Sequence, residues 1–151
     1  MTLAFIIENN RILLALKKRG FGAGRYNGFG GKLLENETFE DALKREMLEE
    51  SGIQVLRAEK VGIHSFMSTE RPDEELEVHV FHVTSYSGEP IETEEMKPEW
   101  FALDTIPFET MWPDDQYWFP LFLADKKFRT KFLFGENDTV LEKDIQEVAE
   151  L

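Results

Sequence analysis

The 151-residue sequence contains no cysteine, which excludes disulfides, thiolate nucleophiles and cysteine-type zinc sites. Basic residues are scarce: 17 lysines and arginines against 30 aspartates and glutamates give a formal net charge of −13. We therefore expect neither a nucleic-acid partner nor a membrane partner, because like charges repel at long range. No apolar run has the length of a membrane span, and the start does not form a signal sequence. A cytoplasmic protein is expected, with mitochondrial and nuclear pools left open.

What remains is a chain rich in apolar and aromatic residues, at 42% and 13% respectively, which is enough for a core and a stacking pocket. The length fits one domain over residues 1–151. Six glycines within residues 20–31 predict a loop that exposes its backbone. Apolar runs around one early helix predict an α+β fold. The expected strands are 3–7, 11–16, 54–67, 76–86, 99–103 and 131–134, with a turn at 71–74, a turn continuing as helix at 112–123 and a closing segment of undecided type at 140–148.

The predicted helix covers Phe39–Ser51 and has signals at both ends. Thr38, followed three residues later by Asp41, forms a variant of the capping box. Gly52 comes directly after the last helical residue and predicts a left-handed C-terminal cap. Both ends of the helix are thus defined by the sequence.

The inner stripe of this helix starts apolar and ends acidic. Glu46, Glu49 and Glu50 continue the stripe that Leu43 begins, and they lie near the negative end of the helix dipole. Arg45 can orient one carboxylate but cannot neutralise three. A hard divalent cation such as Mg²⁺, or Mn²⁺, can do so, since it prefers oxygen ligands. For the helix taken alone, a solvated acidic patch is the alternative.

The spacing around the helix favours the metal site over that alternative, because the sequence has every specified residue of the Nudix box. The matching residues are Gly31, Glu37, Arg45, Glu46, Met47, Glu49, Glu50, Gly52 and Ile53. The chain therefore resembles the Nudix hydrolases. The resemblance implies an α/β/α sandwich with a mixed sheet and a loop-helix-loop motif that binds Mg²⁺. It also implies hydrolysis of a nucleoside diphosphate linked to another group.

Site residues are carried over from this resemblance position by position. Glu46, Glu49 and Glu50 become metal ligands or base candidates, and which of them is the base is left open. Arg45 becomes their orienting residue. The remaining metal ligands are the Gly30 carbonyl and Glu95, although Glu95 taken alone would simply belong to an acidic loop.

Outside the box, nearly the whole chain resembles the eukaryotic MutT-homologue family. The segments that carry this resemblance are 17–25, 27–32, 111–115 and 117–120. It implies that an 8-oxo-purine or 2-hydroxy-adenine deoxynucleoside triphosphate is hydrolysed to monophosphate and pyrophosphate, which cleans the nucleotide pool. The implied substrate-binding residues are Thr2, Lys17, Phe21, Asn27, Phe29, Gly30, Gly31, Lys32, Phe66, Trp112, Pro113, Asp114 and Asp115.

Residue chemistry supports a purine pocket independently of this resemblance. Asp114 and Asp115 can share one proton, since two close carboxylates resist double ionisation, and such a pair both donates to and accepts from a purine edge. Trp112 offers a stacking face, Phe66 an apolar wall and Asn27 an amide that donates and accepts. Taken singly, the aromatic residues would more often be core and the aspartates a turn.

Three positions depart from the pattern of this second family and leave the preferred base open. Tyr26 replaces a tryptophan, Ile63 a glutamine and Ser68 an aromatic residue. A Nudix hydrolase of dinucleoside polyphosphates or nucleotide sugars is the alternative enzyme. A non-catalytic nucleotide sensor ranks lower, because no glutamate of the box is missing. The three histidines are expected to be structural, and the chain is expected to act as a monomer.

Overall fold

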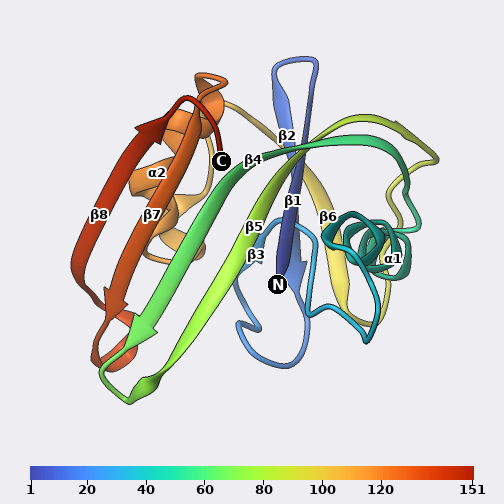
Figure 1. Cartoon of the computed structure of the whole chain (residues 1–151). Coiled ribbons are helices and arrows are strands. Elements are labelled where there is room, and N and C mark those ends of the chain that lie inside the picture. Colours follow the sequence, from blue (N-terminus) through green and yellow to red (C-terminus); the bar gives the residue numbers. More distant parts are fainter.

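An eight-stranded mixed sheet forms the centre of the molecule in a computed structural model that describes all residues 1–151 (Figure 1). The strands are β1 (Thr2–Glu8), β2 (Arg11–Lys17), β3 (Tyr26–Asn27), β4 (Gln54–Ser68), β5 (Arg71–Ser87), β6 (Met96–Ala102), β7 (Lys127–Phe134) and β8 (Val140–Val148). Their order is β3-β2-β1-β5-β4-β7-β8, and β6 pairs with β2. The β1–β5 and β4–β7 pairs are parallel, and the other pairs are antiparallel.

Helices α1 (Phe39–Ser51) and α2 (Asp115–Leu123) cover opposite faces of this sheet (Figure 1). Neighbouring residues of a strand point to opposite faces, so Ala4 joins the core cluster that contains α1, whereas Phe5 joins the cluster around α2. Two short 3-10 turns, η1 (Phe108–Thr110) and η2 (Glu136–Asp138), complete the fold. The expected α/β/α sandwich is confirmed. Neither helix is both long and apolar enough to cross a membrane.

One predicted turn is wrong. Residues 71–74 belong to β5, which begins at Arg71 and pairs with the end of β4, so the reversal occurs at Thr69 and Glu70. The first seven residues of β5 are all exposed, and an exposed extension of a hairpin has no apolar alternation that a sequence could reveal. The undecided segment 140–148 is strand β8, and residues 131–134 are the end of the longer strand β7.

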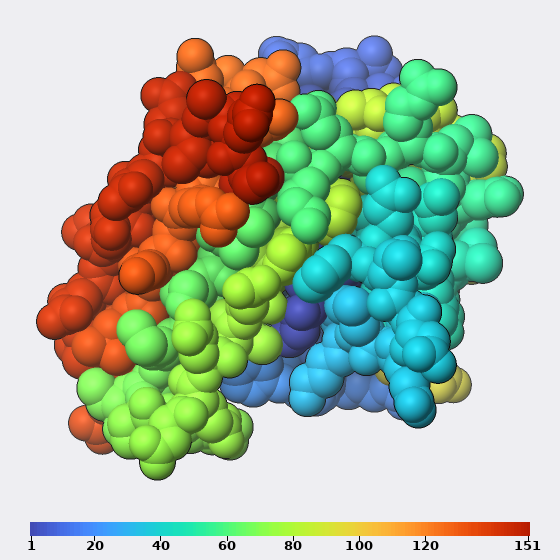
Figure 2. Space-filling view, viewed as in Figure 1, coloured from blue at the N-terminus to red at the C-terminus, as the bar shows by residue number.

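The first residues of the chain are held against β5. Thr2 is buried and pairs with His79 of β5, and the Met1 amino group donates to the Glu77 carbonyl at 3.0 Å. Figure 2 shows the first residues, in the darkest blue, at the bottom of a hollow between β5 and the segment that leads into α1. Pairing with β5 therefore fixes the start of β1, and the backbone of the glycine-rich loop forms hydrogen bonds with the other side of this strand.

His64 is structural, as expected. Its ring is buried among Phe66, Trp118 and Phe128, and Nδ1 forms a 2.6 Å hydrogen bond with the Thr130 hydroxyl. Nε2 is buried without a partner. Burial lowers the pKa of His64 to about 3, so the folded protein keeps this ring neutral.

We expect His64 to weaken the fold as pH falls below 6.5. The unfolded chain binds a proton there at the ordinary pKa of 6.5, whereas the folded ring does not until about 3. The free energy of unfolding should therefore lose up to about 1.4 kcal/mol per pH unit through this group. Urea unfolding at pH 7 and pH 5 measures the slope. A His64→Leu/Thr130→Val protein should lose this component while Thr130→Val alone keeps it, and equal slopes in all three proteins would contradict the assignment.

Candidate functional site

Helix α1 begins and ends as its sequence predicts. The Thr38 hydroxyl accepts a hydrogen bond from the Asp41 amide at 3.1 Å, and Gly52 caps the C-terminus in the left-handed conformation, with φ of 76°. Leu43 and Met47 are fully buried against the sheet. Because these residues fix the rotation of the helix, its last turns hold the glutamates against the glycine-rich loop.

Glu50 is the most buried of these glutamates, with 6% of its surface exposed. Its Oε1 accepts a hydrogen bond from the Gly30 amide at 3.0 Å. Burial, helped by the negative charges of Glu46 and Glu95, raises the pKa of Glu50 to about 8, although the Gly30 hydrogen bond and the charge of Lys17 oppose the rise. Without a cation the group is thus poised to hold a proton.

The glycines beside Glu50 are required by close packing. The Phe29 and Ala4 backbones exchange hydrogen bonds, and the Thr2 amide donates to the Gly31 carbonyl at 2.9 Å. At Gly30 an added Cβ would lie 2.0 Å from the Thr2 carbonyl oxygen, and at Gly31 it would lie 2.7 Å from the Glu46 carboxyl carbon. The loop therefore links the start of β1 to the acidic end of α1.

Alanine at these two glycines should have different effects. Gly30→Ala meets backbone that cannot move without breaking the β1 pairing, so we expect a loss of roughly 2 kcal/mol or more in the free energy of unfolding. Gly31→Ala meets a flexible side chain and displaces the Glu46 carboxylate, so the fold should persist while turnover falls roughly 100-fold. Thermal unfolding and initial rates separate the two effects, and equal losses of stability would contradict this distinction.

Arg45 forms the centre of an ion-pair network. Its Nε and Nη2 donate to the two carboxylate oxygens of Glu37 at 2.7 and 3.0 Å, and its Nη1 donates to Glu46 at 2.9 Å and to Glu49 at 3.4 Å. Arg45 is thus placed to orient carboxylates, as predicted. The sequence did not predict that Glu37 is the bidentate partner of Arg45. Glu37 belongs to the box, but it lies before α1, so helical spacing does not relate the two residues.

Glu95 approaches this cluster from the loop before β6. Burial is the main cause of the raised pKa values of Glu46 and Glu50, and the negative charge of Glu95 adds to both rises. Arg19 donates to Glu95 at 3.1 Å. Arginines thus hold several of the carboxylates, and no three acidic or histidine side chains form a ready-made metal cage. The donor set is nonetheless all oxygen with an uncompensated buried glutamate, which suits a hard divalent cation.

A second cluster lies at the N-terminus of α2. Asp114 and Asp115 are both buried, and Asp114 Oδ2 accepts a hydrogen bond from Trp118 Nε1 at 3.0 Å. Burial raises the pKa of Asp114 to about 6, and burial with the charge of Asp114 raises the pKa of Asp115 well above its ordinary value. Asp115 Oδ2 has no hydrogen-bond partner. The pair can therefore hold a proton and offer both a donor and an acceptor.

Half-buried aromatic rings connect this acidic pair to β4. Phe66 lies 5.7 Å from Phe134, which lies 6.5 Å from Trp112, between ring centroids. Phe21 is 78% exposed, and its ring lies 5.1 Å from the Trp112 ring. Asn27 is on β3, and its Oδ1 accepts a hydrogen bond from the Gly28 amide at 2.8 Å.

Phe29, which the resemblance implies to be substrate-binding, could contact a substrate only through its backbone. Phe29 is fully buried in the cluster that contains Leu43 and Met47, so it supports the glycine-rich loop from inside. Thr2 is also buried and contributes hydrogen bonds to Gly31, whereas Lys32 is exposed beside the loop.

Of the residues that depart from the second family pattern, Tyr26 is directed toward β6. Its hydroxyl donates to Glu99 at 3.0 Å, and its ring lies edge-on to Phe101. Ser68 lies at the end of β4, where its hydroxyl accepts a hydrogen bond from the Glu70 amide. Ile63 is half-buried in the middle of β4 and, as the immediate neighbour of His64, points to the opposite face of the sheet.

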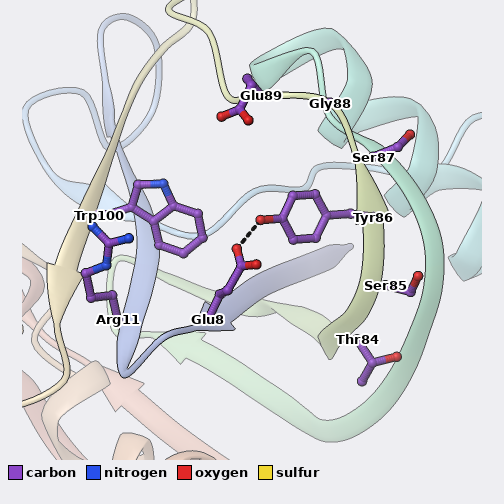
Figure 3. A pocket seen from close by; sticks show the side chains of 9 residues that line it. All are labelled: Glu8, Arg11, Thr84, Ser85, Tyr86, Ser87, Gly88, Glu89 and Trp100. Carbon is purple, nitrogen blue, oxygen red and sulfur yellow. Dashed lines mark hydrogen bonds between the residues drawn. The ribbon is translucent and has the colours of Figure 1, made fainter.

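A hollow of about 520 Å³ lies away from both clusters, between the β1–β2 turn, the end of β5 and β6 (Figure 3). It is open and mostly polar. The Tyr86 hydroxyl donates to Glu8, and the Arg11 guanidinium lies 5.4 Å from the Trp100 ring. Glu8 and Glu89 are the only acidic residues that line the hollow, and its polar groups bind each other, so we place the candidate site at the carboxylates of α1 and the aromatic rings.

Comparisons with known proteins agree with this geometry. A family model described as NUDIX domain matches residues 2–122. The chain is 53% identical over 147 residues to the oxidized purine nucleoside triphosphate hydrolase of Mus musculus, covering 97% of this chain and 94% of that protein. The protein of the same name from Danio rerio is 46% identical over 100% of this chain and 96% of its own length. The crystal structure of a MutT protein from Bacillus halodurans superposes with a TM-score of 0.84 at 27% identity, covering 96% and 95% of the two chains.

Proposed function

Because the chain belongs to the Nudix family, we propose that it hydrolyses oxidised purine nucleoside triphosphates to the monophosphate and pyrophosphate. The two relatives that are 53% and 46% identical over nearly the whole chain bear the name of that activity. The observation that carries the proposal is the buried pair Asp114 and Asp115 beside the half-buried Trp112. We propose further that residues 1–151 act as one domain and as a monomer, since all these groups come from one chain.

Members of this family use a divalent metal ion, and we propose Mg²⁺ here. Its ligands would be the Gly30 carbonyl and the carboxylates of Glu46, Glu49, Glu50 and Glu95. When bound, the ion stabilises charge on the phosphate oxygens and makes a bound water more acidic. Arg45 orients Glu46 and Glu49 through its hydrogen bonds. Lys17 and Lys32 would contact the phosphates.

Glu50 is the group that we propose to take the proton of the attacking water. The Gly30 amide fixes one of its oxygens at 3.0 Å. Burial also keeps this carboxylate in place, and a positioned carboxylate is an effective proton acceptor.

The aspartate pair would recognise the base. Because burial raises the pKa values of both carboxyls, one of them would keep a proton and donate it, whereas the other would accept. A purine oxidised at position 8 or hydroxylated at position 2 presents altered donors and acceptors along its edge, which such a pair can match. Trp112 would stack on the ring, Phe66 would form an apolar wall, and Asn27 would add an amide contact.

A substrate panel with Mg²⁺ tests this function. Initial rates are measured for 8-oxo-dGTP, 2-hydroxy-dATP, dGTP, dATP, a diadenosine polyphosphate and a nucleotide sugar. We expect the two oxidised triphosphates to have the highest kcat/KM, with monophosphate and pyrophosphate as products. Preferred cleavage of the diadenosine compound or of the sugar would contradict the substrate class while leaving the carboxylate chemistry in place.

A further inference from the structure

Three segments that are distant in sequence meet at Trp112. The Arg25 guanidinium, from the glycine-rich loop, lies over the indole at 4.1 Å from its centroid. Its Nη1 also donates to Asp138 Oδ2, in η2, at 3.0 Å. Arg25 thus joins the loop before β3 to the turn between β7 and β8 across the face of the indole.

The backbone holds Arg25 in this place. Its carbonyl accepts from the Lys17 amide at 3.0 Å, and its amide donates to the Gly22 carbonyl at 3.2 Å. An added Cβ at Gly22 would lie 3.2 Å from Cζ2 of Trp112, so the loop lies directly against the indole. The Arg25 side chain is 29% exposed, and a partly desolvated cation binds an aromatic face more strongly than an exposed one.

We propose that Arg25 is a positioning residue that sets base affinity and base specificity by fixing and polarising Trp112. This inference rests on the proposed function. A cation on one face of an indole draws π-electron density toward itself, so an electron-rich oxidised purine stacks on the ring more strongly. The planar guanidinium suits this role because it can stack and form an ion pair at the same time.

Arg25 also acts on the acidic pair. Its positive charge opposes the burial that raises the pKa of Asp114. The charge therefore favours the ionised form of Asp114, which accepts hydrogen bonds. The Arg25 guanidinium would thus influence both the stacking of the base on Trp112 and its hydrogen bonding to Asp114.

Three variants separate the effect of the cation on the indole from the effect of the ion pair with Asp138. Arg25→Gln removes the cation, Asp138→Asn removes only its ion-pair partner, and the exchange Arg25→Asp/Asp138→Arg restores the ion pair without a cation on the indole. Arg11→Gln is the matched control, since Arg11 also lies over a tryptophan, Trp100, but away from the site (Figure 3). Each protein is assayed for KM and kcat with 8-oxo-dGTP, and by calorimetry for the Kd of 8-oxo-dGMP and of inorganic pyrophosphate.

For Arg25→Gln we expect KM and the Kd of 8-oxo-dGMP to rise roughly three- to tenfold, with kcat within about twofold and pyrophosphate binding unchanged. The exchange should not restore affinity, and Asp138→Asn should have a smaller effect. Unchanged 8-oxo-dGMP binding in Arg25→Gln, equal weakening of pyrophosphate, or full rescue by the exchange would overturn this inference alone. A wild-type protein without activity on oxidised purine triphosphates would overturn the proposed function as well.

Discussion

Glu50→Gln should lower kcat by roughly 1,000-fold or more, because it removes both a proton acceptor and a proposed metal ligand. The amide has the same shape, so the fold should persist. Stability should even rise slightly at neutral pH, since the raised pKa of Glu50 means that the folded protein must bind a proton there, which glutamine does not need. Steady-state rates and thermal unfolding of the same preparation measure the two quantities.

The matched control is Glu40→Gln on the first turn of α1, where the side chain is exposed and has no hydrogen bond to the site. Its rate should stay within about twofold of wild type, since a surface change away from the site has little effect. A Glu50→Gln protein with the activity of the Glu40→Gln protein would refute the role of the acidic cluster.

Asp115→Asn should lower kcat/KM for 8-oxo-dGTP roughly 100-fold, because an amide cannot reproduce the shared proton and leaves buried polar groups mismatched. The Asp115 carboxyl is buried with one oxygen unpartnered, so a bound substrate would supply a hydrogen bond that the protein lacks. The loss should be much smaller for dGTP.

The pH dependence of the affinity for 8-oxo-dGMP tests the same pair of aspartates. Burial raises the pKa values of both aspartates, so the pair holds a proton up to a higher pH than exposed aspartates do and loses it as pH rises further. Affinity should therefore decrease toward alkaline pH in the wild-type protein, and calorimetry of Asp115→Asn should show a flatter profile. Identical profiles for the two proteins would exclude a shared proton.

The sequence predicted those features that depend on local pattern. Thr38, Gly52 and the apolar stripe fix α1, and the spacing of its glutamates indicates their common face. The exposed start of β5 has no such pattern, so the sequence alone predicts a turn there. The resemblance implies that Phe29 belongs to the substrate site but does not indicate the direction of its side chain. A strand alternates its side chains between faces, and only the pairing with Ala4 shows that Phe29 points inward.

The sequence did not predict the contacts within the site between residues that are distant along the chain. Arg45 was expected to orient carboxylates, yet its bidentate bond to Glu37 depends on how the loop before α1 folds back. The contact of Arg25 with Trp112 joins residues from opposite halves of the chain. No periodicity links such positions, so only the fold reveals that they meet.

The most direct test of the central claim is a competition in one reaction between 8-oxo-dGTP and dGTP with Mg²⁺. The ratio of product formation gives the ratio of kcat/KM and is independent of enzyme concentration. We expect wild-type protein to favour 8-oxo-dGTP by at least roughly tenfold and Asp115→Asn to bring the ratio close to one. A wild-type ratio near one, with both nucleotides hydrolysed, would contradict recognition of oxidised bases by the buried pair.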